Sequence, residues 1–100
     1  MKSDISIQEA KNLLASNPSV KLIDVRTVAE YATGHIEGSV NIPLSNLIEI
    51  YKQFPDRQTP ILVHCKSGGR SYQAKDILVS LGYTNVLNIG GINGWPLTRV

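Results

Sequence analysis

Cys65 is the residue of this sequence best suited to act as a nucleophile. It is the chain's one cysteine, and it lies between an apolar run and the segment Lys66-Ser67-Gly68-Gly69-Arg70. The thiolate is the reactive form of cysteine, and an unperturbed thiol with a pKa of about 8.5 is only a few per cent ionised at neutral pH. Chemistry at Cys65 therefore requires surroundings that stabilise a negative sulfur.

The residues after Cys65 are of the types that provide such surroundings. Lys66 and Arg70 add positive charge, and a helix expected to begin at Ser71 directs free N–H groups and the positive end of its dipole toward the loop. Gly68 and Gly69 let the backbone curl, so that successive N–H groups converge on one anion. We expect an electropositive loop able to hold both a thiolate and an anionic substrate.

A strand before this loop and a helix after it must position Cys65. Residues 60–65 predict a strand buried on both faces, because apolar positions follow one another without alternation, as in a central parallel strand. The following helix carries its apolar residues at i, i+3, i+4 and i+7 spacing, and Gly82 is its expected end. These apolar residues are Ala74, Ile77, Leu78 and Leu81.

The rest of the chain alternates between helices and strands in the same way. Capping boxes at Ser6–Glu9 and Thr27–Glu30 predict two helices, and Ser45 is expected to cap a third. Further strands are predicted around Ile5 and over residues 20–25, 40–42 and 86–89, with a tight turn over residues 90–96. The alternation indicates an α/β domain with a mostly parallel sheet between two helical layers, whose ligands bind at the carboxyl ends of the strands.

Composition excludes several other classes of protein. A chain of 100 residues, 42% hydrophobic and 18% charged, predicts one globular domain over residues 1–100. The net charge of +2 gives no reason to expect nucleic acid or a membrane as partner, and no apolar run is long enough to span a bilayer. The N-terminus lacks the apolar stretch of a secretory signal, so we expect a cytoplasmic protein.

Three ordered blocks of this sequence resemble the rhodanese family. They are Leu22–Arg26 with Glu30-Tyr31 and Gly34–Pro43, then Cys65–Ser71, then Gly90–Trp95. The resemblance implies a three-layer α/β fold with a five-stranded, mainly parallel sheet. It also implies sulfur transfer from thiosulfate or a persulfide, through a cysteine persulfide, to cyanide, a small thiol or a protein cysteine. No metal and no organic cofactor are expected.

The resemblance also assigns the site residue by residue. Cys65 matches the family's catalytic cysteine, and the residues after it match the loop that binds the sulfur donor. The substrate-binding residues expected on this basis are Lys66, Ser67, Gly68, Gly69, Arg70 and Ser71.

Other polar residues near predicted strand ends are expected to have structural roles. Asp24 and Arg26 are expected to form a salt bridge that supports nearby backbone, and His35 to hold a turn. His64 neighbours Cys65, but successive strand residues point to opposite faces, which argues against a Cys–His catalytic pair. With two histidines and no ligand cluster, the sequence predicts no metal site.

Two alternative functions remain open from the sequence. A phosphatase or arsenate reductase on the related scaffold uses five residues between its cysteine and arginine, whereas four separate Cys65 from Arg70. A non-catalytic binding module of the rhodanese type commonly lacks the cysteine, which this chain retains. The sulfurtransferase is the favoured interpretation.

Overall fold

A parallel sheet of four strands forms the centre of the computed structural model, which describes residues 3–98. The strands are β1 (Lys21–Asp24), β2 (Val40–Asn41), β3 (Ile61–Cys65) and β4 (Val86–Gly91), in the spatial order β2-β1-β3-β4. Each neighbouring pair is parallel. β3 lies between two strands and is buried at all five positions, which confirms the central strand predicted to carry Cys65.

The sheet has four strands in the described residues, not the expected five. The segment around Ile5 makes one backbone hydrogen bond to β4, from Asp4 N to Asn88 O at 2.7 Å. It then enters a helix, because the next available amide, Ser6 N, donates to Glu9 Oε1 at 3.0 Å in the capping box. With this donor used in the cap, the segment does not continue as a strand.

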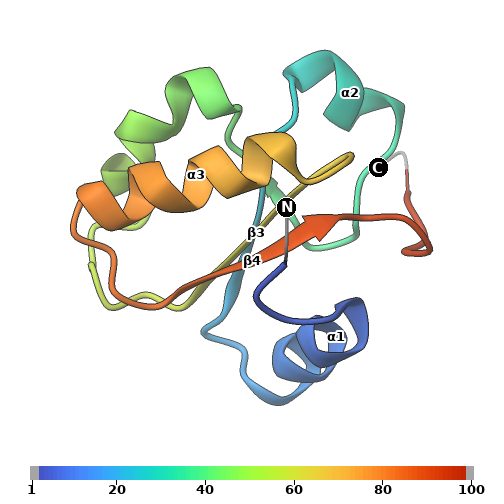
Figure 1. Cartoon of the computed structure of the whole chain (residues 1–100), viewed down its shortest axis with the longest axis horizontal. Coiled ribbons are helices and arrows are strands. Elements are labelled where there is room, and N and C mark those ends of the chain that lie inside the picture. Colours follow the sequence, from blue (N-terminus) through green and yellow to red (C-terminus); the bar gives the residue numbers. More distant parts are fainter. Residues whose placement is uncertain (1–2, 99–100) are drawn as a thin grey trace.

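The helix α1 (Ile7–Ser16) precedes β1, and three helices connect the strands: α2 (Val28–Thr33), η1 (Leu44–Lys52) and α3 (Gly69–Ser80). Figure 1 shows how α1 and α3 lie relative to the strands. Both predicted capping boxes are present, at Ser6–Glu9 before α1 and Thr27–Glu30 before α2. Within residues 3–98, none of the helices combines the length and apolarity needed to cross a bilayer.

The third helix differs from the prediction. η1 is a 3₁₀ helix that follows Pro43, and Ser45 lies inside it as its second residue. The Ser45 hydroxyl bonds to Asn46 Oδ1 at 3.0 Å instead of a backbone amide, so it does not cap the helix. Pro43 provides the extended residue before the first turn, with φ −53° and ψ 147°.

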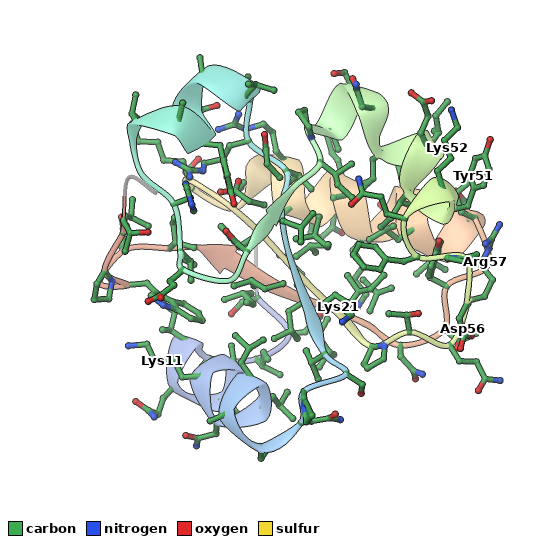
Figure 2. The ribbon with its side chains drawn as sticks, turned by 180° about the vertical axis from the view of Figure 1, so that it is seen from behind. Lys11, Lys21, Tyr51, Lys52, Asp56 and Arg57 are labelled. Carbon is green, nitrogen blue, oxygen red and sulfur yellow. The ribbon has the colours of Figure 1, made fainter. Side chains whose placement is uncertain are left out.

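The sheet separates two apolar clusters. α1 covers one face, where its Ala10 packs with Leu22 and Leu62, and α3 and η1 cover the other, where Val63 and Cys65 are buried. In Figure 2, the labelled Lys11 on α1 accordingly lies across the sheet from Tyr51 and Lys52 on η1. Alternation along β3 therefore places Cys65 in the layer beneath α3.

α3 begins earlier than the sequence predicts. Gly68 is its N-cap, with a left-handed φ of 105°, and Ser71 is its third residue instead of its cap. Gly68 adopts this conformation without the steric penalty of a β-carbon, so the chain turns into the helix three residues after Cys65. The predicted end is confirmed, since α3 stops at Ser80 and Gly82 follows with φ 96°.

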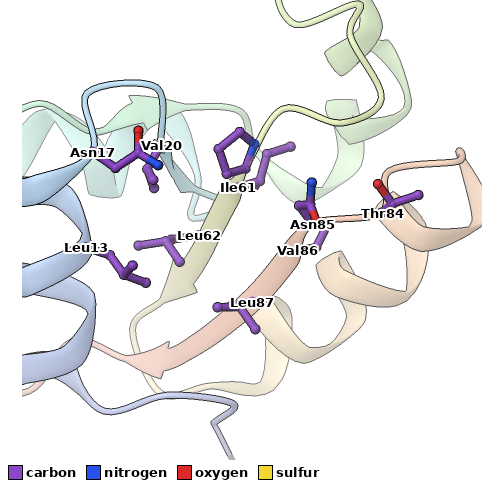
Figure 3. A pocket seen from close by; sticks show the side chains of 10 residues that line it. Leu13, Asn17, Val20, Ile61, Leu62, Thr84, Asn85, Val86 and Leu87 are labelled. Atoms are coloured by element: carbon purple, nitrogen blue, oxygen red, sulfur yellow. The ribbon is translucent and has the colours of Figure 1, made fainter.

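A mainly apolar cavity of about 350 Å³ lies at the amino ends of β3 and β4, beside α1 (Figure 3). Leu13 of α1, Leu62 of β3 and Leu87 of β4 line it. Cys65 is at the carboxyl end of β3, so this cavity and the predicted nucleophile lie near opposite ends of that strand.

Candidate active site

The Cys65 side chain lies inside the loop that joins β3 to α3. It is 1% exposed, and the Gly68 amide donates a hydrogen bond to its Sγ at 2.9 Å. The Ser71 hydroxyl lies 3.5 Å from the same sulfur, and the amides of Ser67 and Ser71 are near enough to lower the pKa of the Cys65 thiol. Several donors thus converge on one atom, which is the geometry of an anion-binding nest.

The start of α3 explains why these donors are available. The first four N–H groups of a helix have no carbonyl partner within it. Ser71 is the third residue of α3, so its amide is one of these free donors. The left-handed Gly68 turns the preceding amides inward, and the local sequence therefore produces a cradle for one anion.

Two opposing effects act on the pKa of the Cys65 thiol. Burial raises this pKa, whereas hydrogen bonding with the Ser71 hydroxyl and with the amides of Ser71, Gly68 and Ser67 lowers it. The hydrogen bonds dominate, and the pKa lies below its ordinary value. The Ser71 hydroxyl is also 3.1 Å from Gly68 O, so its proton can turn from that carbonyl to a thiolate.

Arg70, the second residue of α3, pairs with Glu30 of α2. Its Nη2 is 2.9 Å from Glu30 Oε2, and its Nη1 bonds to Oε1. The Arg70 hydrogen bonds are the main reason that the pKa of Glu30 falls to about 2. Sequence reasoning identified Glu30 only as a capping residue, because nothing in the local pattern links it to an arginine 40 positions later.

The other predicted site residues differ in burial. Gly68 and Ser71 are buried beside the sulfur, Gly69 is half-buried as the first residue of α3, and Lys66 and Ser67 are exposed. Ser67 contributes its backbone amide to the cradle. The structure thus brings the predicted loop together around Cys65, and its role in binding a donor stays a prediction.

A buried ion pair stabilises the turn after β1. Arg26 donates from Nε and Nη2 to Asp24, at 3.0 and 2.7 Å, and its Nη2 also donates to Gly34 O at 2.7 Å. His64 Nε2 is 3.9 Å from Asp24 Oδ2, and neither ring nitrogen of His64 has a hydrogen-bond partner within residues 3–98. The salt bridge expected between Asp24 and Arg26 is therefore confirmed, and it supports the backbone at Gly34.

His35 holds a turn, as its position in the sequence predicts. Its Nδ1 is 2.9 Å from Tyr31 O, and its ring stacks on the Tyr31 ring with 3.7 Å between centroids. The Tyr31 hydroxyl in turn donates to Ser39 O at 2.6 Å. These contacts hold the backbone between α2 and β2.

Sequence comparisons agree with this geometry. A family model described as Rhodanese-like domain matches residues 6–97. Thiosulfate sulfurtransferase PspE of Escherichia coli is 40% identical over 79 residues, which cover 78% of this chain and 76% of that protein. A protein named Sulfurtransferase from Allochromatium vinosum is 38% identical over 96 residues, which cover 95% of this chain and 89% of that protein.

Solved structures show the same fold. One described as rhodanese with anions from E. coli superposes with a TM-score of 0.75 at 38% sequence identity. The match covers 81% of this chain and 99% of that one. The family model, these relatives and the shared fold together show that this chain belongs to the rhodanese family.

Proposed function

We propose that this protein is a sulfurtransferase that carries sulfane sulfur as a persulfide on Cys65. The observation that carries the proposal is the convergence of backbone amides on a buried sulfur, with Gly68 N 2.9 Å from Cys65 Sγ. Such a cradle stabilises a negative sulfur atom without a charged side chain in contact with it. The names of the relatives support thiosulfate as the first donor to test.

The first step is a substitution at the outer sulfur of the donor. The Cys65 thiolate attacks that sulfur, a new S–S bond forms, and the bond between the two donor sulfurs breaks. For thiosulfate, the electron pair of the broken bond leaves with sulfite. Lys66, exposed at the loop, and Arg70 supply positive charge near the incoming and leaving anions.

The second step returns Cys65 to its starting state. An acceptor nucleophile attacks the outer persulfide sulfur, and the Cys65 thiolate leaves. Cyanide gives thiocyanate, and a small thiol or protein cysteine gives a new persulfide. The amides that hold the thiolate stabilise it again as a leaving group, because a lower pKa improves departure.

Two observations argue against the alternatives. The loop has one residue fewer between cysteine and arginine than a phosphatase loop, and Arg70 is already bound by Glu30. A binding module does not require a cysteine held by converging amides. One domain over residues 1–100, the absence of a cofactor and a cytoplasmic location remain predictions from the sequence.

Intact-mass spectrometry after incubation with thiosulfate tests the proposal. The expected result is a gain of one sulfur atom, mapped to Cys65 by peptide analysis and removed by cyanide or dithiothreitol. Cys65→Ser is the control, since the chain has no other cysteine, and its mass should not change.

Two outcomes would contradict the proposal. Sulfur gained by the Cys65→Ser variant would exclude Cys65 as the carrier. A wild-type protein that reacts with iodoacetamide, yet takes sulfur from neither thiosulfate nor a small persulfide, would favour a binding role.

A further inference from the structure

The carboxyl end of β4 lies against the cysteine loop. Gly91 is the register partner of Cys65 across the β3–β4 pair. The register shifts within this pair, since Val63 faces Asn88 but His64 faces Gly90, which leaves Ile89 as one extra residue in β4. Such a bulge bends its strand and redirects the residues after it.

The local sequence of β4 favours this bend. Gly90 has a φ of +88°, a left-handed conformation that glycine adopts without a β-carbon penalty. Its amide donates to Asn88 Oδ1 at 2.8 Å, so an asparagine side chain holds the bent backbone. The tight turn predicted over residues 90–96 is therefore partly strand, because β4 continues through Gly91.

Gly91 has no room for a side chain. A β-carbon there would lie 2.8 Å from Lys66 O, 3.2 Å from Ser67 Cα and 3.3 Å from Ser67 C. All three are backbone atoms of the cysteine loop, so no side-chain rotation relieves the contact. The loop itself would have to move by several tenths of an ångström.

The backbone that would move is the one that holds the sulfur. Ser67 and Gly68 supply amides to Cys65, and Gly68 also lies beside Gly91, whose amide nitrogen would be 3.7 Å from a β-carbon on Gly68. The hydrogen bond from Gly68 N is 2.9 Å long, and such bonds weaken steeply as distance and angle depart from their preferred values. A small displacement at Gly91 therefore reaches the donors directly.

We propose that Gly91 is a positioning residue for sulfur transfer, whose missing side chain lets the Lys66–Ser67 backbone lie against β4 while the amides of Ser67 and Gly68 point at Cys65. The inference that Gly91 assists sulfur transfer rests on the proposed function. The contacts that support it concern only how the loop holds the Cys65 thiolate. Gly91 acts through the cysteine loop, because the atoms nearest to its β-carbon position belong to the backbone of Lys66 and Ser67.

The test measures the rate of Cys65 alkylation by iodoacetamide across a pH series, in wild type and Gly91→Ala. In Gly91→Ala the midpoint of the profile should rise by about one pH unit, a tenfold change in the ionisation constant. Uptake of sulfur from thiosulfate, followed by intact mass, should slow in the same variant. Gly94→Ala is the matched control, because Gly94 has a φ of +83° but a β-carbon there meets no described atom within 4 Å.

Gly94→Ala carries the general cost of alanine at positive φ and should keep the wild-type midpoint. A folded Gly91→Ala protein with an unchanged midpoint overturns the proposal. If Gly91→Ala is unfolded in buffer, the profile is measured in trimethylamine N-oxide, which favours compact states. A Gly91→Ala protein that stays unfolded in trimethylamine N-oxide also contradicts the proposal, because the proposal confines the displacement to the cysteine loop.

Alkylation requires no sulfur donor, so this test is separate from that of the proposed function. A raised midpoint in Gly91→Ala, with no sulfur uptake by wild type, would support Gly91 as the support of the cradle and reject sulfurtransfer from thiosulfate. An unchanged midpoint in Gly91→Ala, with normal sulfur uptake by wild type, would reject Gly91 as the support of the cradle and support sulfur transfer from thiosulfate.

Discussion

Arg70 and Glu30 form a bidentate ion pair that joins the first turn of α3 to the first turn of α2. Two guanidinium nitrogens meet the two carboxylate oxygens, and Nη2 to Oε2 is 2.9 Å. Both side chains are about one-third exposed. Glu30 also accepts from Thr27 N at 3.1 Å as part of the α2 capping box. A negative charge is thus held beside the loop that is proposed to receive an anionic donor.

Neutralising that carboxylate should favour an anionic donor. For Glu30→Gln we expect the KM for thiosulfate to fall about threefold, the effect of roughly 0.6 kcal/mol. Glutamine retains the capping function, since it serves as well as glutamate in a capping box. Steady-state kinetics at low and high salt check this prediction, because screening should remove the difference. A KM of Glu30→Gln that exceeds the wild-type KM at low salt would contradict the prediction.

Removing Arg70 should have the opposite effect. Arg70→Ala should raise the KM for thiosulfate about tenfold, which corresponds to about 1.4 kcal/mol of donor binding. The partly exposed ion pair should contribute no more than about 1 kcal/mol to the free energy of unfolding. Kinetics and urea unfolding measure both quantities. A variant that is unfolded, or that keeps its KM, would assign Arg70 a purely structural role.

The Ser71 hydroxyl should contribute to the low pKa of Cys65. In Ser71→Ala the midpoint of the alkylation profile should rise, because one of the groups that outweigh burial is removed. Ser67→Ala is the matched control, since the Ser67 side chain is exposed and its backbone amide remains. Equal midpoints in the two variants would exclude the hydroxyl as a contributor.

His64 should make the protein less stable in mild acid. Burial is the main cause that lowers its pKa from 6.5 to about 4, and the positive charge of Arg26 adds to the effect against the attraction of Asp24. Between these values the unfolded chain binds a proton that the folded chain does not. The free energy of unfolding should therefore fall as pH drops from 6.5 to about 4, by about 3 kcal/mol.

Urea unfolding across that pH range measures the effect, with His64→Gln as control. The variant has no group to titrate there, so its slope should flatten even if its overall stability is lower. Glu30 acts in a more acidic range, because its pKa falls from 4.5 to about 2. An equal slope in wild type and variant would assign the acid sensitivity to other groups.

The buried Asp24–Arg26 pair should matter far more than a surface pair. Arg26 is 5% exposed and Asp24 is fully buried, so Arg26→Met leaves a carboxylate without its counter-charge. Breaking a buried pair in this way costs about 3–5 kcal/mol of unfolding free energy. Lys52→Met is the comparison, because Lys52 pairs with Glu49 at the surface and should show no measurable loss. Similar losses in both variants would contradict the assignment.

Local sequence patterns predicted the elements that local chemistry controls. Both capping boxes, the buried strand through Cys65 and the glycine after α3 were predicted, because each depends on residues within one or two turns of the chain. The active-site loop was predicted from a cysteine that is followed by two glycines and two basic residues. Family resemblance added the reaction, which residue types alone left open.

Contacts between distant segments could not be predicted. Ser71 was predicted to cap α3, and this prediction was wrong. Gly68 is the N-cap, because a left-handed glycine allows the helix to begin earlier. The pairing of Arg70 with Glu30 and the approach of Gly91 to Lys66 O depend on how α2 and β4 pack against the loop. The missing fifth strand depends on whether the Ser6 amide bonds within its cap or to a neighbouring strand.

The two ends of β3 offer separate routes for redesign. Its amino end borders the apolar cavity of about 350 Å³ beside α1, and its carboxyl end holds the sulfur. A larger aliphatic side chain at Val20, such as isoleucine, would fill space on the first side without entering the cysteine loop. Thermal tolerance and nucleophile strength could thus be adjusted independently beside the two ends of one five-residue strand, which makes this small protein a practical starting point for engineered sulfur carriers.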